Sequence, residues 1–244
     1  MYHHRSTLGP VELAFTDRHG GVSGVPYDSL NLALLEDGAP DVPRRNLAIV
    51  LDDFAPGCSA DAVADMSQVH GSRVVVAAPG GPRPEADGIV TDRPGVVLVT
   101  RAADCVPVLL ADAAAGVVGA AHAGRPGVAA GVVAATVEAM RDLGARDVTA
   151  WVGPHVCGAC YEVPQQLQDD VAALVPATRA TTSWGTPSLD LGAGVRAQLE
   201  AAGAAVVDVA ACTRESADLY SHRRDGARAG RHAGLVRLAA GGAR

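Results

Sequence analysis

Three short strings of the sequence place a residue type that binds metals beside a glycine or a turn residue. They contain His70 in Gln-Val-His-Gly, Cys105 in Ala-Asp-Cys-Val-Pro and His122 in Ala-His-Ala-Gly. His70 and His122 each end an apolar segment, and Cys105 begins one. If these segment ends converge, one thiolate and two imidazoles can hold a zinc ion with one position open, which is the ligand count of a catalytic site. Isolated His and Cys residues at strand ends are more often packing residues, so the pattern alone leaves a structural role open.

The elements that must position these residues are short and rich in Val, Ala and Leu. Helical patterns occur at residues 43–54, 127–143, 164–174 and 189–202. Apolar runs bounded by Gly, Pro or Asp predict strands at residues 11–15, 73–77, 96–100, 106–110, 117–121 and 206–209. Several strands follow one another between residues 73 and 121 without room for crossover helices, which favours mixed pairing over a doubly wound parallel sheet. The sequence predicts an α+β fold, with no linker dividing residues 1–244.

The composition excludes several classes of protein. The 244 residues are 48% apolar, and 28 Gly, 15 Pro and 5 Cys show no short period, which excludes disorder, collagen, a coiled coil and a disulfide-stapled miniprotein. A net charge of −7 argues against a protein that binds nucleic acid by neutralising phosphates. No apolar run fits a secretory signal or a membrane span, because residues 113–137 are interrupted by His122, Arg125 and Pro126. We expect a cytoplasmic protein with reduced cysteines and neither a nucleic-acid nor a membrane partner.

Cys157 and Cys160 form a C-x-x-C pair, which is found in zinc ribbons and in redox proteins. No second C-x-x-C exists to complete a four-cysteine site, and the preceding segment is not a convincing thioredoxin-type strand. We therefore predict that both residues are cysteines of the core or of a pocket wall. The same prediction applies to Cys58 and Cys212.

Eight strings, taken together and in order, are specific to one known family. They begin at Arg18, Ser29, Gln68, Ala86, Ala103, Ala121, Gly153 and Tyr220, and the series runs from residue 13 to about residue 238. With them the chain resembles the laccase-domain (YfiH-like) family of purine nucleoside phosphorylases, formerly named polyphenol oxidase or peptidoglycan editing factor. The resemblance implies a single α+β domain with mixed β-sheets flanked by helices. It also implies a zinc site with the ligands His70, Cys105 and His122.

The activity that the resemblance implies is the cleavage of purine nucleosides by phosphate. Adenosine, inosine, guanosine and methylthioadenosine are the implied substrates, and adenosine is also deaminated. Zinc suits deamination because it lowers the pKa of a water molecule that attacks C6 of adenine. Our candidate catalytic residues are Cys105, His122 and Asp104, the last as the carrier of the proton. An alternative role for Asp104 is to orient His70 or His122.

Phosphorolysis also needs a pocket for the phosphate anion. Arg223 and Arg224 are candidates because their guanidinium groups donate two parallel hydrogen bonds, and Arg18 lies in a Gly-rich loop. Ion pairs with neighbouring aspartates explain these arginines about as well. Arg125 is a fourth candidate, although the family usually reads His-Ala-Gly-Trp-Arg-Gly where this chain has Arg125 and Pro126 after Gly124. The candidate polar liners for ribose or base are Asn31, Gln68, Asp87 and Ser221, and turn capping is the alternative for Asn31 and Asp87.

Other functions stay open at this point. A copper polyphenol oxidase would use the same three ligands, but the oxygen-reducing cluster of a laccase needs many more histidines than remain among eight. A Cys-His hydrolase of a cell-wall precursor would use Cys105 as the nucleophile and His122 as its base. A non-enzymatic binding module is the last alternative. Our first hypothesis has zinc as the cofactor, with copper as the alternative, purine nucleosides and phosphate as partners, and a monomer or homodimer.

Overall fold

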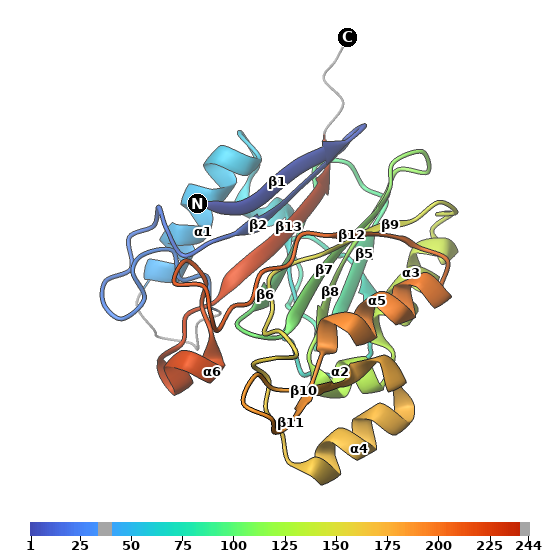
Figure 1. Cartoon of the computed structure of the whole chain (residues 1–244). Coiled ribbons are helices and arrows are strands. Elements are labelled where there is room, and N and C mark those ends of the chain that lie inside the picture. Colours follow the sequence, from blue (N-terminus) through green and yellow to red (C-terminus); the bar gives the residue numbers. More distant parts are fainter. Residues whose placement is uncertain (34–40, 240–244) are drawn as a thin grey trace.

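Two β-sheets pack face to face, and helices cover their outer faces (Figure 1). The computed structural model describes residues 1–33 and 41–239. Both sheets are built from segments that are distant in the sequence, and the larger sheet mixes parallel with antiparallel pairs. The predicted α+β class, with mixed sheets flanked by helices, is confirmed.

The first sheet has five strands in the order β1-β2-β13-β6-β3. Its strands are β1 (Tyr2–Leu8), β2 (Val11–Thr16), β3 (Val63–Ala64), β6 (Val97–Ala102) and β13 (His232–Leu238). The β13 strand lies in the middle and pairs antiparallel with both β2 and β6. Helix α1 (Val42–Phe54) covers the outer face of this sheet, where Val50, Leu51 and Phe54 pack on apolar residues of the strands.

The second sheet has six strands in the order β12-β9-β7-β8-β5-β4. Its strands are β4 (Val74–Val76), β5 (Gly88–Thr91), β7 (Val106–Asp112), β8 (Val117–Ala123), β9 (Thr149–Val152) and β12 (Ala205–Asp208). Its outer face carries the helices α2 (Arg125–Ala129), α3 (Val132–Asp142) and α5 (Leu191–Ala201), and α4 (Gln165–Leu174) packs beside α2. The small hairpin of β10 (Arg179–Thr181) and β11 (Pro187–Leu189) lies beside α4 (Figure 1).

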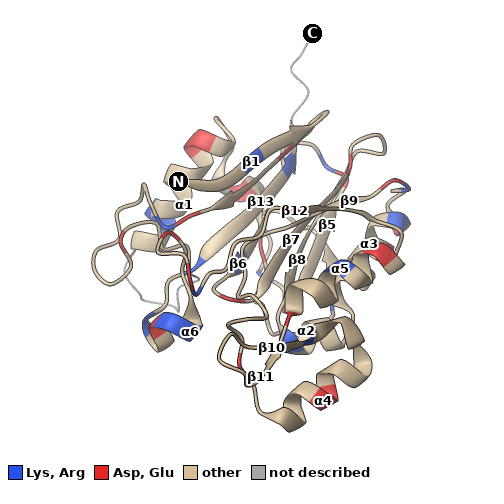
Figure 2. Cartoon of the chain, viewed as in Figure 1, with Lys and Arg blue, Asp and Glu red and all other residues tan. Residues whose placement is uncertain are grey.

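Strand β7 shows why the central strands are almost entirely apolar. Val108 and Leu110 face the helices, while Leu109 and Ala111 face the five-stranded sheet. Successive side chains of a strand point to opposite faces, so a strand that is covered on both faces needs apolar residues throughout. Figure 2 shows the result, with few charged residues on the strands of the two sheets and more on the helices and loops.

The six predicted strands are all confirmed, and three of the four predicted helices correspond to α1, α4 and α5. The helix predicted at residues 127–143 is wrong as a single helix, because the chain forms α2 and α3 with Gly131 between them at φ 79°. A glycine tolerates this left-handed conformation without steric cost. Strand β1 escaped prediction because none of its residues is buried and residues 3–7 are polar without interruption.

Short helical turns complete the fold. They are η1 (Ala60–Ala62), η2 (Pro176–Thr178), α6 (His222–Asp225) and η3 (Gly226–Arg228). In the described part of the chain, no helix combines the length and the apolar character that a membrane span requires.

Candidate active site

The open end of the β7–β8 hairpin brings Cys105 and His122 together. His122 is paired with Pro107 in the antiparallel register, and Cys105 comes directly before β7. Strand β5 runs antiparallel to β8 on its other side, so that Asp87, directly before β5, also lies at this end. The backbone N–H of His122 donates to the Asp87 carbonyl oxygen at 2.8 Å. Strand register alone therefore aligns three chemically active residues along one edge of the sheet.

Asp87 also fixes the loop that carries His70. Its carboxylate accepts hydrogen bonds from the backbone N–H groups of Val69 at 3.2 Å, His70 at 3.0 Å and Gly71 at 2.7 Å. His70 itself has φ 62°, an uncommon conformation for a residue with a side chain. Burial alone would raise the pKa of Asp87, but the hydrogen bonds from His122 and from these N–H groups outweigh it and lower that pKa. Asp87 is therefore an ionised carboxylate that holds the loop in place.

The same carboxylate orients His122. The Nδ1 atom of this buried imidazole lies 2.8 Å from Asp87 Oδ1. An ionised carboxylate only accepts hydrogen bonds, so Nδ1 carries a proton, and Nε2 is the nitrogen that can bind a metal once its own proton is released. Burial opposes protonation of His122, but its hydrogen bonds to Asp87 and Cys105 prevail and raise its pKa to about 9. Burial likewise would raise the pKa of Cys105, but the bonds from His122 and His70 lower it to about 6.

The three predicted ligands fit a metal ion. His70 Nε2 lies 3.7 Å from Cys105 Sγ, and one ligand atom of each of His70, Cys105 and His122 lies within 4.8 Å of the others. Two ligands of one tetrahedral zinc ion are separated by roughly 3.6 Å, given Zn–N and Zn–S bonds of about 2.0 to 2.3 Å. His122 is buried while His70 is exposed, so the cluster is accessible from one side. This donor set has the composition of a catalytic zinc site with one open position.

Gly124 follows His122 by two residues and leaves room for this cluster. A Cβ atom at this position would collide with the His70 ring and approach Cys105 Sγ to 3.2 Å. The glycine of the Ala-His-Ala-Gly string is therefore a requirement of the site. Arg125, the next residue, begins α2 and is partly exposed.

Asp104 lies next to Cys105 but does not face the histidines. Its Oδ1 atom accepts a hydrogen bond from the Thr213 hydroxyl at 2.6 Å, and its Oδ2 atom accepts one from the backbone N–H of Arg223 at 2.6 Å. The residue that orients His122 is Asp87, so the alternative prediction that gave this role to Asp104 is wrong. Asp104 instead ties the start of β7 to two segments late in the chain.

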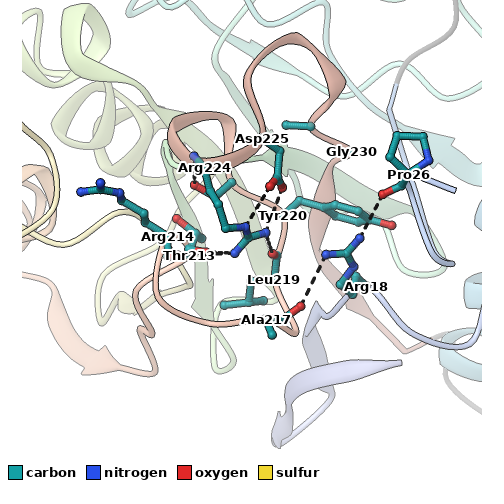
Figure 3. Close-up of polar contacts among 12 residues, drawn as sticks. Arg18, Pro26, Thr213, Arg214, Ala217, Leu219, Tyr220, Arg224, Asp225 and Gly230 are labelled. Carbon is teal, nitrogen blue, oxygen red and sulfur yellow. Dashed lines mark hydrogen bonds and ion pairs between the residues drawn. The ribbon is translucent and has the colours of Figure 1, made fainter.

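Arg224 and Arg18 donate hydrogen bonds to the backbone of the loops around them (Figure 3). Arg224 donates to the carbonyl oxygens of Thr213, Ser216 and Leu219 at 3.0, 2.7 and 2.7 Å, and pairs with Asp225 at 2.9 Å. Arg18 donates to the carbonyl oxygens of Asp28 and Pro26 at 2.8 and 3.1 Å, and its guanidinium lies over the Tyr220 ring. Both arginines line a cavity of about 240 Å³ with Asp225 and Arg228. Their hydrogen bonds to carbonyl oxygens are those of structural arginines.

Arg223 has a different setting from its neighbour Arg224. Its backbone binds Asp104, and its guanidinium lies 4.4 Å from the centre of the Tyr161 ring and donates to the Glu162 carbonyl oxygen at 2.9 Å. The Arg223 residue is exposed. Of the four arginines predicted to bind phosphate, two therefore lie next to residues that adjoin Cys105 or His70. Arg223 binds Asp104 through its backbone, and Arg125 follows Gly124.

The remaining predicted polar liners have partners in the backbone. Asn31 Oδ1 accepts from the N–H groups of Ala33 and Arg231 at 3.0 and 2.9 Å. The Gln68 amide exchanges two hydrogen bonds with the backbone of Arg101, at 2.7 and 2.9 Å. Ser221 caps α6 by accepting from the N–H of Arg224. These contacts agree with roles in turns and caps.

The chain is similar over its length to characterised sequences and structures. A family model described as multi-copper polyphenol oxidoreductase laccase matches residues 12–239. A purine nucleoside phosphorylase of Streptomyces coelicolor is 50% identical over 246 aligned positions, which cover 98% of this chain and 100% of the relative. A purine nucleoside phosphorylase of Deinococcus radiodurans is 43% identical and covers 93% of this chain and 89% of the relative.

A solved structure agrees with the fold. The crystal structure of a Neisseria meningitidis protein matches with a TM-score of 0.84 at 34% identity, over 97% of this chain and 99% of that chain. The ordered strings, the matched family model and these relatives agree with one another. The chain therefore belongs to the laccase-domain (YfiH-like) family, whose model carries the description multi-copper polyphenol oxidoreductase laccase.

Proposed function

We propose that this protein is a zinc-dependent purine nucleoside phosphorylase that also deaminates adenosine. The name shared by the Streptomyces and Deinococcus relatives supports phosphorolysis of purine nucleosides. The observation that carries the proposal is the convergence of His70, Cys105 and His122 within 4.8 Å, with His122 oriented by a buried carboxylate. Adenosine, inosine, guanosine and methylthioadenosine, together with phosphate, are the proposed substrates.

Each residue of the site has a defined task in this proposal. His70, Cys105 and His122 would hold the zinc ion, which would supply a Lewis acid. Asp87 keeps the proton on His122 Nδ1 and holds the His70 loop through backbone N–H groups. Asp104 acts as a positioning residue, because both of its oxygens accept hydrogen bonds from other segments of the chain.

In this proposal, Arg125 and Arg223 bind the phosphate. The nucleophile of phosphorolysis is an anion, and a guanidinium binds phosphate oxygens through two parallel N–H donors. Arg125 adjoins Gly124, which lies against His70 and Cys105, and Arg223 adjoins Asp104. Arg18 and Arg224 organise the neighbouring loops instead.

The test is phosphate-dependent release of base from inosine and adenosine. The parent protein loaded with zinc is expected to release hypoxanthine or adenine only when phosphate is present, and to convert adenosine to inosine without it. His70→Ala, Cys105→Ala and His122→Ala are each expected to lose zinc and both activities. Cys58→Ser, a half-buried cysteine outside the cluster, is the matched control and should retain both. A zinc-loaded parent that is inert toward all purine nucleosides would refute the proposal.

A Cys-His hydrolase is the second candidate, because one observation favours it. The low pKa of Cys105, about 6, and the high pKa of His122, about 9, describe the thiolate and imidazolium that such enzymes use. An acyl-enzyme trapped on Cys105 would support this candidate. If bound zinc protects Cys105 from alkylation, this would support a role for Cys105 as a metal ligand.

The copper oxidase named by the family model receives less support. All eight histidines lie in the described residues, yet only His70 and His122 fall within a group there that could hold a metal. Four-electron reduction of oxygen requires several copper ions with many histidine ligands. Oxygen uptake with a phenol by the copper-loaded protein would restore this candidate.

A further inference from the structure

A second group of metal-binding side chains lies outside the site described above. One ligand atom each from Cys157, Cys160, Cys212 and Glu215 lies within 4.8 Å of the others. The first pair has the spacing C-x-x-C and the second pair the spacing C-x-x-E. Cys160 is buried, Cys157 and Cys212 are half-buried, and Glu215 is exposed. Cys160 Sγ donates to Glu215 Oε1 at 3.4 Å, although the two residues are 55 positions apart.

Two turns build this group. The N–H groups of Cys160 and Tyr161 donate to the Cys157 carbonyl oxygen at 3.0 Å, and the N–H of Ser216 donates to the Cys212 carbonyl oxygen at 3.0 Å. A bridge between His155 and Cys212 fixes the two turns side by side. Backbone hydrogen bonds therefore hold the two turns, and with them the four side chains, in place without a bound ion.

Without a cation, the thiols of this group favour the neutral form, because burial raises the pKa of Cys157 and, together with the hydrogen bond to Glu215, raises the pKa of Cys160 to about 12. The backbone N–H of Cys157 donates to Cys212 Sγ at 3.5 Å, a bond that stabilises a thiolate. The Arg214 guanidinium donates to the Cys160 carbonyl oxygen at 3.3 Å and lies over the Trp184 ring, which places a positive charge beside the group. Three sulfurs and a carboxylate at these separations repel one another once ionised, unless a cation lies among them.

We propose that Cys157, Cys160, Cys212 and Glu215 form a second metal site, which holds a structural zinc ion. Three thiolates and one carboxylate complete a tetrahedral set, and a set of four protein ligands is the mark of a structural site. Thiolates select zinc over magnesium and calcium. Binding releases the three thiol protons to solvent and changes no oxidation state. Cys157 and Cys212 line a cavity of about 320 Å³, through which the ion reaches the site.

The position of the site indicates what it stabilises. Thr213 lies between Cys212 and Glu215, and its hydroxyl binds Asp104, the residue before Cys105. The Arg224 guanidinium binds the carbonyl oxygens of Thr213 and Ser216 in the same turn. A zinc ion that fixes this turn also fixes the contact of Asp104 with the late segments of the chain.

Zinc content per chain tests the proposal. The protein is saturated with zinc in the presence of a thiol reductant, freed of excess metal by gel filtration, and analysed by elemental mass spectrometry. We expect two zinc ions per parent chain, one in Cys160→Ser, one in His122→Ala and none in the combined variant. Cys58→Ser is the matched control and should retain two. One zinc ion per parent chain that is lost with His122→Ala would overturn the proposal.

A spectrum of the cobalt protein gives a readout that does not depend on activity. Three of the four proposed cysteine ligands belong to the second site, so Cys160→Ser should remove more of the thiolate-to-cobalt absorption than Cys105→Ser does. If Cys160→Ser fails to fold, Glu215→Gln replaces it, because Glu215 is exposed and its loss leaves the core intact. Glu215→Gln should weaken zinc binding at this site at least about tenfold. An unchanged affinity, or a disulfide among these cysteines in the zinc-saturated protein, would contradict the proposal.

Discussion

Two groups of metal-binding side chains are built by different means. They are the His70 cluster, with Cys105 and His122, and the Cys157 cluster, with Cys160, Cys212 and Glu215. Strand register aligns Cys105 and His122, whereas two turns tied by a backbone bridge gather Cys157 and Cys212. The first cluster offers three ligands and one open side, and the second offers four ligands and no vacancy. The comparison shows that one fold can build an open centre on the edge of a sheet and a closed one from hydrogen-bonded turns.

The two clusters are joined through Asp104. Its carbonyl oxygen accepts a hydrogen bond from the backbone N–H of Val156, the residue before Cys157, at 3.1 Å. Thr213, in the turn of the second cluster, donates its hydroxyl proton to Asp104, which precedes Cys105 in the first. Both residues are buried, so this hydrogen bond is shielded from water. Changes that affect one cluster, or that remove a contact between them, test the comparison directly.

Metal removal should produce the largest effect. The open centre exposes His70, so a chelator is expected to strip this centre first. Its removal should lower phosphorolysis at least about 100-fold, because a Lewis acid supplies several kcal/mol. The closed cluster should release its metal more slowly. Zinc content and activity are measured on the same samples over time. Activity that persists in metal-free protein would contradict the open centre, and simultaneous loss of both metals would contradict the difference between the two clusters.

Acid should destabilise the region between the clusters through His232. This fully buried imidazole pairs with Ala102 on β6, and its ring contacts the Pro154 carbonyl oxygen. Burial lowers its pKa from 6.5 to about 4. The unfolded chain therefore takes up a proton at higher pH than the folded chain. This contribution to stability is complete above about pH 6.5 and is lost as the pH falls toward about 4, by up to about 3 kcal/mol.

The measurement compares the free energy of unfolding of the parent and His232→Gln by denaturant titration from pH 7 to pH 4. Glutamine retains a donor for the Pro154 carbonyl oxygen but takes up no proton. Both proteins have the same metal ligands, so acid release of metal affects them equally. The stability of the parent should fall relative to that of the variant as the pH decreases. Parallel curves would assign the acid sensitivity to other groups.

Asp87→Asn should affect the open centre alone. Asparagine cannot offer the charged acceptor that orients His122, and its amide N–H₂ opposes the backbone N–H groups of the His70 loop. We expect zinc affinity at this centre to fall about 10- to 100-fold, as measured by competition with a chelator. The matched control is Asp112→Asn, because Asp112 is a buried carboxylate that accepts four backbone N–H bonds away from both clusters. The control should lose stability without losing zinc affinity, and equal zinc affinities in the two variants would contradict the role of Asp87.

Thr213→Val should give the smallest change and measures the coupling of the clusters. The variant removes the hydroxyl donor to Asp104 and should cost about 1 to 2 kcal/mol of stability, because a buried oxygen loses its partner. Both zinc ions should be retained, with a decrease in kcat/KM of at most about tenfold. Thr136→Val, which removes a buried hydroxyl within α3, serves as the control and should leave kcat/KM unchanged. Unchanged kcat/KM in Thr213→Val as well would show that the Thr213 hydroxyl does not couple the clusters.

The ligands of the open centre could be found from the sequence because they stand at the ends of apolar runs. Strands that are buried on both faces are apolar throughout, so His122 and Cys105 mark where β8 ends and β7 begins. The role of Asp87 was harder to assign. An aspartate before a strand also fits a turn, and only the antiparallel register places it beside His122.

The second cluster and the arginines lay beyond sequence reasoning for a different reason. Cys160 and Glu215 meet across 55 positions through irregular turns, which have no periodicity. Arg224 has a long side chain that reaches three backbone carbonyl oxygens, and a sequence motif does not show in which direction such a side chain points. Their surroundings, rather than their residue types, decide their roles.

The central place of β13 has a consequence for how the protein is made. This strand is synthesised after the other four strands of its sheet, yet it lies between β2 and β6 and supplies a partner for both. Until residue 238 has been synthesised, β2 and β6 each expose an unpaired edge that can pair with another nascent chain. The five-stranded sheet is therefore completed only after residue 238 has been synthesised, and we expect a chain truncated before β13 to be degraded by proteases.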